Sequence, residues 1–202
     1  MQPIDTDELA PFDDRDIVRG VLDGRVDDFA ILLARYRRYV GKIVAGIVPA
    51  EMIPDLAQEI FVEAYTSLAA FNPRSSFKKW LAGIAVHRCY DYWRQRYRRR
   101  EVPFSALGEE HLQWVEGVQA ARARDRFAVG EGRKEAAEIL QWAMAGLTAE
   151  DRMVLTLVHL EGFSVQEAAE ALGWSQVNVR VRAHRSRQKL RKRLTELPEE
   201  ER

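Results

Sequence analysis

One segment of the chain combines aromatic rings with arginines at helical spacing. Residues 76–100 read SFKKWLAGIAVHRCYDYWRQRYRRR. Arginine donates to phosphate oxygens, and an exposed ring can stack on an unpaired base. Duplex DNA hides its base faces, whereas a single strand presents bases and phosphates together. The composition therefore predicts a surface for single-stranded nucleic acid, with only some of Tyr90, Trp93 and Tyr97 exposed. The spacing assigns other apolar positions to a core: Phe77, Leu81, Ile84 and Ala85.

A second basic block lies near the C-terminus. Residues 174–193 contain eight bases and no acid, and 78–100 contains eight bases against one acid. Acidic chain separates them, since 1–30 has nine acids against three bases and 101–170 has 13 against six. The 202-residue chain is neutral, with 31 basic and 31 acidic residues, so its net charge conceals this separation. Two basic blocks predict two separate contacts with a polyanion.

Composition limits the class of protein. Hydrophobic residues make up 47% of the chain, enough for one or two packed domains. A single cysteine, Cys89, excludes a disulfide scaffold and fits a reducing compartment. No apolar run approaches the roughly 18–20 residues that span a bilayer. The N-terminal stretch MQPIDTDELAPFDDRD is too acidic for a signal or transit peptide. We therefore expect a cytoplasmic protein without membrane insertion.

Helical periodicity dominates, so we expect an all-α protein of two small helical domains joined by a flexible linker. Residues 26–48 carry apolar side chains at i, i+3, i+4 and i+7 spacing. A second helix is expected over about 55–70, and residues 71–76 (FNPRSS) read as a loop. Residues 101–131 lose the pattern and read as the linker. The second helix should bury one set of side chains, Leu56, Ile60, Ala64 and Leu68, and present another, Asp55, Gln58, Glu59, Val62 and Glu63.

The C-terminal part predicts a helix-turn-helix. Thr148 is placed to cap one helix, and Ser164 with Glu167 forms a capping box for the next. The turn 172–174 contains Gly173, and Ser175 is placed to cap a long final helix. Two helices joined by a short glycine-containing turn are typical of this DNA-binding motif.

The final helix should read duplex DNA. Its inner face is expected to pack on the preceding helices through Val179, Ala183, Ser186, Leu190 and Leu194. A recognition helix meets base edges in the major groove, where the arginine fork suits guanine O6 and N7. Later charges would contact phosphates: Lys189, Arg191, Lys192 and Arg193. The outward face comprises Arg180, Val181, His184, Arg185, Arg187 and Gln188.

Two other classes of function are open to test. An enzyme such as a nuclease is disfavoured, because the four histidines form no metal-ligand spacing beyond the weak pair of His87 and Cys89. No glycine-rich phosphate loop occurs either, so we expect no catalytic site, no metal and no cofactor. A helix-turn-helix regulator that never joins RNA polymerase is the main alternative, although it gives residues 55–100 no role.

Three stretches resemble the extracytoplasmic-function (ECF) group of bacterial RNA polymerase sigma factors. They are residues 55–65 (DLAQEIFVEAY), 71–100 and 147–190. The resemblance implies an alternative sigma factor that binds core RNA polymerase and directs promoter-specific transcription initiation. It divides the chain into a region 2-like domain (1–100), a linker (101–131) and a region 4-like helix-turn-helix domain (132–202).

The resemblance also implies partners and site residues. The partners are the clamp of the largest polymerase subunit, the flap of the second-largest, single-stranded and duplex promoter DNA, and an anti-sigma factor or another regulator. The residues that match the polymerase-binding patch are Asp55, Gln58, Glu59 and Val62. Those that match the minus-ten DNA site are Phe71, Asn72, Arg74, Ser75, Ser76, Phe77, Lys78, Lys79, His87, Arg94, Arg98 and Arg99. Those that match the minus-thirty-five site are Ser175, Gln176, Asn178, Arg180, Val181, His184, Arg185 and Arg187.

This chain departs from the family pattern at three places. Residues 52–54 (Met-Ile-Pro) stand where many members carry acids, which weakens the expected clamp contact and suggests phosphorylation of Thr66 or Ser67 as a hypothesis. His87 stands where asparagine is common, so minus-ten preference should differ. Val177 and Val181 replace a frequent glycine and serine, so the upstream sequence should differ as well.

Overall fold

The computed structural model describes residues 13–99 and 131–196, and all regular structure in these ranges is helical. This confirms the all-α prediction. The predicted linker lies outside the described residues, except for Glu131, which begins a helix. The α-helices are α1 (Asp14–Leu22), α2 (Phe29–Ala45), α3 (Ile53–Thr66), α4 (Phe77–Arg98), α6 (Glu131–Ala145), α7 (Ala149–Leu155), α8 (Val165–Leu172) and α9 (Gln176–Thr195). Short 3-10 turns occupy η1 (Val26–Asp28), η2 (Ala50–Met52) and η3 (Leu68–Ala70), and a π turn forms η5 (Thr156–Leu160).

The N-terminal half is built on three mutually packed helices, α2, α3 and α4. Their apolar faces meet in a core where Val40, Ile60 and Leu81 are fully buried. The helix predicted over 26–48 is divided, because η1 precedes α2 and the helix ends before Gly46. The helix predicted from about 55 starts at Ile53, with Pro54 in its first turn, where proline costs no hydrogen bond.

The three helix caps predicted in the C-terminal half are confirmed. Thr148 accepts from the backbone N–H of Asp151, and Ser175 accepts from that of Asn178. Ser164 and Glu167 form the reciprocal capping box. Gly173 ends α8 in the left-handed region, with φ of 64°, a conformation that a side chain would strain. Gly173 and Ser175 thus define where α8 ends and where α9 begins.

A buried carboxylate fastens α9 to α7. Asp151 is 1% exposed and accepts from Arg182 Nη1 at 3.1 Å and from Lys189 Nζ at 2.6 Å. Burial acts to raise the pKa of Asp151, but the Lys189 hydrogen bond and the charges of Lys189 and Arg182 hold it below its usual range. Lys189 and Arg182 lie seven residues apart, about two helical turns, so one carboxylate fixes the rotation of α9.

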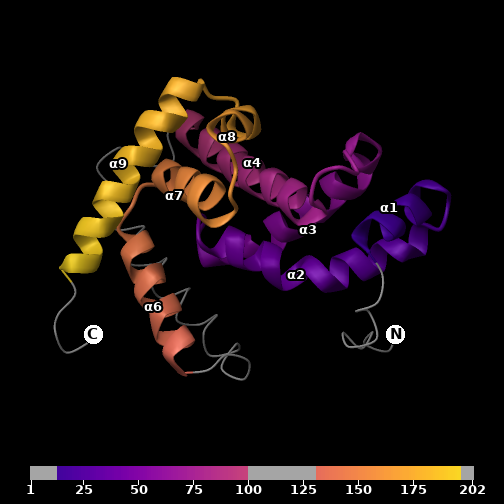
Figure 1. Cartoon of the computed structure of the whole chain (residues 1–202), viewed down its shortest axis with the longest axis horizontal. Helices are drawn as coiled ribbons and strands as arrows, with labels where there is room; N and C mark the ends of the chain where they lie inside the picture. Colours follow the sequence, from indigo (N-terminus) through magenta and orange to yellow (C-terminus); the bar gives the residue numbers. More distant parts are fainter. Residues whose placement is uncertain (1–12, 100–130, 197–202) are drawn as a thin grey trace.

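Of the C-terminal helices, α7 and α8 pack against α4, and their core is continuous with that of the N-terminal half (Figure 1). Buried Arg152 on α7 donates from Nη2 to the Ile47 carbonyl, at 2.9 Å. The rings of Tyr90 on α4 and Trp174 in the α8–α9 turn meet edge to face, with centroids 5.6 Å apart. The structure is therefore a closed arrangement of the two halves.

Candidate polymerase and nucleic-acid interfaces

The predicted polymerase-binding residues lie on one exposed face of α3. Asp55, Glu59 and Val62 follow i, i+4 and i+7 spacing, and Gln58 lies between them. Val62 is 56% exposed and is the apolar member of this face. The four line a groove of about 520 Å³ together with Glu63, Thr66 and Arg88. The structure thus brings the predicted set together as one acidic patch with an apolar centre.

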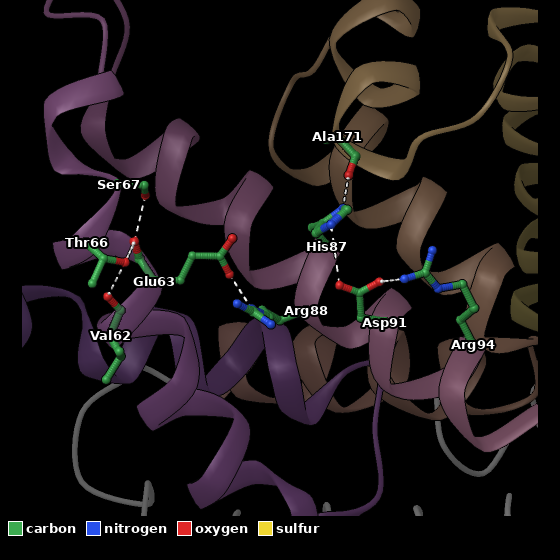
Figure 2. A network of polar contacts seen from close by, with 9 residues as sticks. All are labelled: Val62, Glu63, Thr66, Ser67, His87, Arg88, Asp91, Arg94 and Ala171. Carbon is green, nitrogen blue, oxygen red and sulfur yellow. Dashed lines mark hydrogen bonds and ion pairs between the residues drawn. The ribbon is translucent and has the colours of Figure 1, made fainter. Parts of the chain in front are cut away.

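The hydroxyls at the C-terminal end of α3 are already used in hydrogen bonds (Figure 2). Thr66 Oγ1 donates to the carbonyls of Val62 and Glu63, at 3.0 and 3.1 Å. Ser67 Oγ donates to the Glu63 carbonyl at 2.6 Å, and the Glu63 carboxylate pairs with Arg88. A phosphate here would lose these bonds and lie at the negative end of the α3 dipole. Local electrostatics therefore oppose the phosphorylation hypothesis.

The loop between α3 and α4 is held by its own polar groups. Asn72 Oδ1 accepts from the backbone N–H of Arg74 at 3.0 Å, and the Ser75 hydroxyl donates to the Asn72 carbonyl at 2.8 Å. Ser76 caps α4. Asn72, Arg74 and Ser76 are exposed, as a base-binding loop requires.

The aromatic residues at the two ends of this loop are buried, which confirms the core position that helical spacing predicts for Phe77. Phe71 and Phe77 are 6% and 3% exposed, and their rings pack against each other and against Trp80. They are core residues because the loop must be anchored at both ends to an apolar cluster. Their rings anchor the loop at both ends, and most of the polar residues between them are exposed.

Few rings of α4 are open to stack on bases. Trp93 is 4% exposed and donates from Nε1 to the Ile47 carbonyl at 3.1 Å, so it belongs to the core. Tyr97 is 37% exposed but stacks on Trp93, with ring centroids 5.7 Å apart. Tyr90 is half-buried against Trp174. The expectation that only some of these three are surface residues is met, with Tyr97 the exposed one.

The C-terminal half covers part of the predicted minus-ten surface. Lys79 Nζ binds both carboxylate oxygens of Glu167 on α8, at 2.8 and 2.9 Å. This hydrogen bond and those from Ser164 lower the pKa of Glu167 to about 2, so the carboxylate stays charged at neutral pH. Lys78 lies 3.9 Å from Glu161, which also accepts from Tyr39. Both lysines of the predicted minus-ten site thus lie beside glutamates of the C-terminal half.

His87 is also engaged in the closed arrangement. Its Nδ1 lies 2.7 Å from the carbonyl oxygen of Ala171, near the C-terminal end of α8, and its Nε2 lies 3.5 Å from Asp91 (Figure 2). Asp91 in turn pairs with Arg94 at 2.9 Å. In this arrangement α8 therefore lies directly beside His87.

A hollow of about 330 Å³ remains at the C-terminal end of α4. It is lined by rings and arginines of the predicted surface and by one acid from α7: Tyr90, Trp93, Arg94, Tyr97, Arg98 and Glu150. Helical spacing predicts that the α4 residues of this hollow share one face of the helix. Nothing in the sequence near Glu150 or Trp174 indicates that these two residues lie beside α4. Arg99 follows on the exposed surface.

The predicted minus-thirty-five residues all lie on the open side of α9 or at its start. Val179, Ala183 and Ser186 are buried, as predicted. His184 Nε2 lies 3.0 Å from Gln188 Nε2, so these two polar groups orient each other. Lys189 is tied to Asp151 and is less available to phosphates than its sequence position indicates. The exposed set is Ser175, Gln176, Asn178, Arg180, Val181, His184, Arg185 and Arg187.

Comparison with known proteins decides the family. Residues 32–99 match the family model of Sigma-70 region 2, and 137–190 match that of Sigma-70, region 4. RNA polymerase sigma factor YlaC of Bacillus subtilis is 32% identical over 171 residues, covering 83% of this chain and 94% of that protein. The ECF RNA polymerase sigma-E factor of Escherichia coli K12 is 29% identical over 176 residues, covering 87% and 91%. The chain belongs to the ECF group of sigma factors.

Solved structures of sigma factors share the fold of this one. CnrH, in complex with the cytosolic domain of CnrY, gives a TM-score of 0.53 at 24% identity over 90% of this chain and 97% of its own. RpoE of Bartonella quintana, in complex with the anti-sigma factor NepR, gives 0.55 at 18% identity over 85% and 99%. In the described ranges of this sigma factor, no helix is both long and apolar enough to cross a membrane.

The family assignment establishes the broad function. The chain is an alternative sigma factor that directs transcription. Its interpretation as an independent helix-turn-helix regulator is not favoured. Its C-terminal half is the DNA-binding helix-turn-helix that the caps and the glycine turn predict.

Proposed function

We propose that the α3 groove is the surface through which this sigma factor joins the clamp of the largest core polymerase subunit. The supporting observation is the grouping of Asp55, Gln58, Glu59 and exposed Val62 in one groove. An apolar centre with charges around it has the composition of a protein-binding patch. We assign the contact with the flap of the second-largest subunit to the region 4-like domain, 132–202.

Reversal of charge in this groove should weaken core binding. Asp55→Arg or Glu59→Arg places a cation where the partner surface must be positive, so we expect the affinity for core polymerase to fall about tenfold or more. Fluorescence titration of labelled core measures it. The matched control is Glu51→Arg, which changes an exposed acid in η2 outside the groove. Equal affinities for all three variants and the parent chain would remove the assignment.

We propose that the loop 71–77 and the exposed face of α4 take the melted minus-ten strand, and that α9 reads the minus-thirty-five duplex. The loop offers Asn72, Arg74 and Ser76, α4 offers Arg94 and Arg98, and Arg99 follows at the end of the helix. An extruded base can be read on all its edges, at an unpairing cost of a few kcal/mol. Residues 1–100 and 132–202 then act as two DNA-binding domains, with 101–131 as their connection.

The closed arrangement supports a requirement for core polymerase. While Glu167 binds Lys79 and α8 lies beside His87, the C-terminal half covers part of the surface that we assign to the minus-ten strand. We expect little promoter binding by the free chain and strong binding once core is added, because polymerase binding separates the halves. An electrophoretic shift with and without core tests this; a dimeric regulator would instead bind paired half-sites alone.

Loss of the Lys79–Glu167 pair should expose part of the minus-ten surface. Glu167→Gln keeps the capping box, since glutamine also serves at that position, and removes only the charge. The pair is partly exposed to solvent, which weakens it, so we expect a gain of about two- to fivefold in affinity of the free chain for single-stranded DNA. Glu170→Gln, on the same helix without a lysine partner within the described contacts, is the control. An unchanged affinity for Glu167→Gln would count against occlusion.

We further propose that this sigma factor has no catalytic site of its own, that it acts in the cytoplasm where transcription takes place, and that an anti-sigma factor restrains it. Both structural neighbours were determined in complex with another polypeptide, in one case named as an anti-sigma factor. Co-purification from the native cell, with and without the inducing stress, tests the last point.

A further inference from the structure

The open side of α9 carries two aliphatic side chains among its charges. Val177 is 68% exposed and Val181 is 42% exposed. They lie four residues apart, so they are neighbours along one ridge of the helix. Exposed β-branched residues are poor helix formers and gain nothing from water contact. Their presence at the start of a helix that is otherwise basic and polar calls for a partner that buries them.

The ridge faces directly away from the rest of the protein. Successive residues of a helix turn by about 100°, so Val177 lies roughly opposite Ser186, nine residues on, which is fully buried. The same rotation places His184 and Gln188 on the ridge beyond Val181. The two valines therefore lead the surface that would enter a major groove, and their side chains would reach deepest at the N-terminal end of the helix.

The chemistry around the ridge selects DNA as the occupant. Arg180 and Arg187 lie on one flank and Arg185 on the other, all exposed and well placed for phosphates or guanine. Within the major groove, the C5 methyl of thymine is the apolar group that a base edge presents. Charged flanks with an apolar centre thus fit a duplex that places thymine methyls between guanine or phosphate contacts.

We propose that Val177 and Val181 are specificity-determining residues that select thymine in the upstream promoter element through its methyl group. This inference rests on the proposed role of α9 as the reader of that element. It predicts at least one thymine at the position facing each valine, on either strand. The interaction is lost when the methyl is removed, even though base pairing and the hydrogen-bonding edge of the base stay unchanged.

Deoxyuridine provides the test, because it pairs as thymine does and lacks only the methyl. A promoter is first selected from a library with a randomised upstream element, using this sigma factor with core polymerase. Each thymine of the element is then replaced singly by deoxyuridine, and holoenzyme affinity is measured by competition. We expect a loss of about three- to fivefold at one or two positions, on the scale of one buried methyl group.

The variant Val177→Ala/Val181→Ala completes the experiment. Alanine favours the helix, so the variant should fold. We expect it to bind the thymine duplex as weakly as the parent binds the deoxyuridine duplex, and to be indifferent to the replacement. Val26→Ala, which changes a 52% exposed valine in η1, should leave the parent's discrimination intact.

The contrary outcomes are distinct. The proposal is overturned if the parent holoenzyme binds the thymine and deoxyuridine duplexes equally at every position. It is also overturned if the double variant binds core polymerase more weakly by the same factor with either duplex, since the valines would then contact polymerase. Arg180→Ala is measured in parallel. If it loses upstream preference while the deoxyuridine scan is silent, only the thymine inference fails; if it too has no effect, the role of α9 fails with it.

Discussion

Replacement of Arg180 or Arg185 by alanine is expected to lower promoter binding by about 1–3 kcal/mol and to relax sequence choice in the upstream element. Both side chains are exposed on the open face of α9, while the buried face of the helix is fixed by Val179 and Ala183. Because the backbone is anchored independently, loss of either guanidinium should remove a base contact without moving the helix. Transcription from a panel of promoters with single changes upstream measures the effect.

The contrast with a phosphate contact makes this prediction specific. Changing Arg98 and Arg99 at the end of α4 should weaken binding to all promoters similarly and flatten its salt dependence. Arg180→Ala and Arg185→Ala should instead change the ranking of promoters. If the two substitutions lower the affinity for every promoter by the same factor, then the two arginines contact only the DNA backbone. Base readout must in that case lie elsewhere on α9.

Replacement of Asp151 should have a large effect on stability. Asp151→Ala removes the acceptor for Arg182 and Lys189, which join α7 to α9. A buried pair that loses one partner commonly costs about 3–5 kcal/mol, but both cations here can turn toward solvent, so we expect about 1–3 kcal/mol. Urea unfolding of the intact chain, followed by circular dichroism, gives the free energy of unfolding.

The pH dependence of this contribution has a definite sign. The pKa of Asp151 is lower in the folded chain than in the unfolded one, where it is about 3.9. The folded state is therefore favoured above that value, and the stabilisation is lost as the pH falls through the folded pKa. The difference in unfolding free energy between the parent and Asp151→Asn should be constant near neutral pH and shrink below about pH 4. A difference that persists unchanged at low pH would mean that the charge contributes nothing.

Features set by near neighbours in the chain are predictable from the sequence. The Ser164–Glu167 capping box and the Gly173 turn depend on residues a few positions apart, so the spacing of residue types is enough to locate the helix-turn-helix. The exposed face of α3 follows from its periodicity in the same way, with Val62 as its apolar member.

Contacts between distant parts of the chain leave no such signal. Lys79 and Glu167 are 88 residues apart, and neither has a neighbour that marks it as half of a pair. Composition makes Trp93 one of three candidate stacking rings, yet its indole reaches the Ile47 carbonyl and lies in the core. The family resemblance assigns Phe71 to the base-binding loop, and nothing near it in the sequence indicates that its ring is buried against Phe77 and Trp80.

In the proposed mechanism, this chain binds core polymerase through α3 and, once bound, reads intact duplex with α9 and an opened strand with α4 and its preceding loop. Run-off transcription with purified core, on a promoter selected from genomic fragments, tests this mechanism most directly. We expect transcripts with the full chain and core together, none with either alone, and a strong decrease with Asp55→Arg. Transcription that is independent of the chain, or undiminished by Asp55→Arg and Arg180→Ala alike, would contradict it.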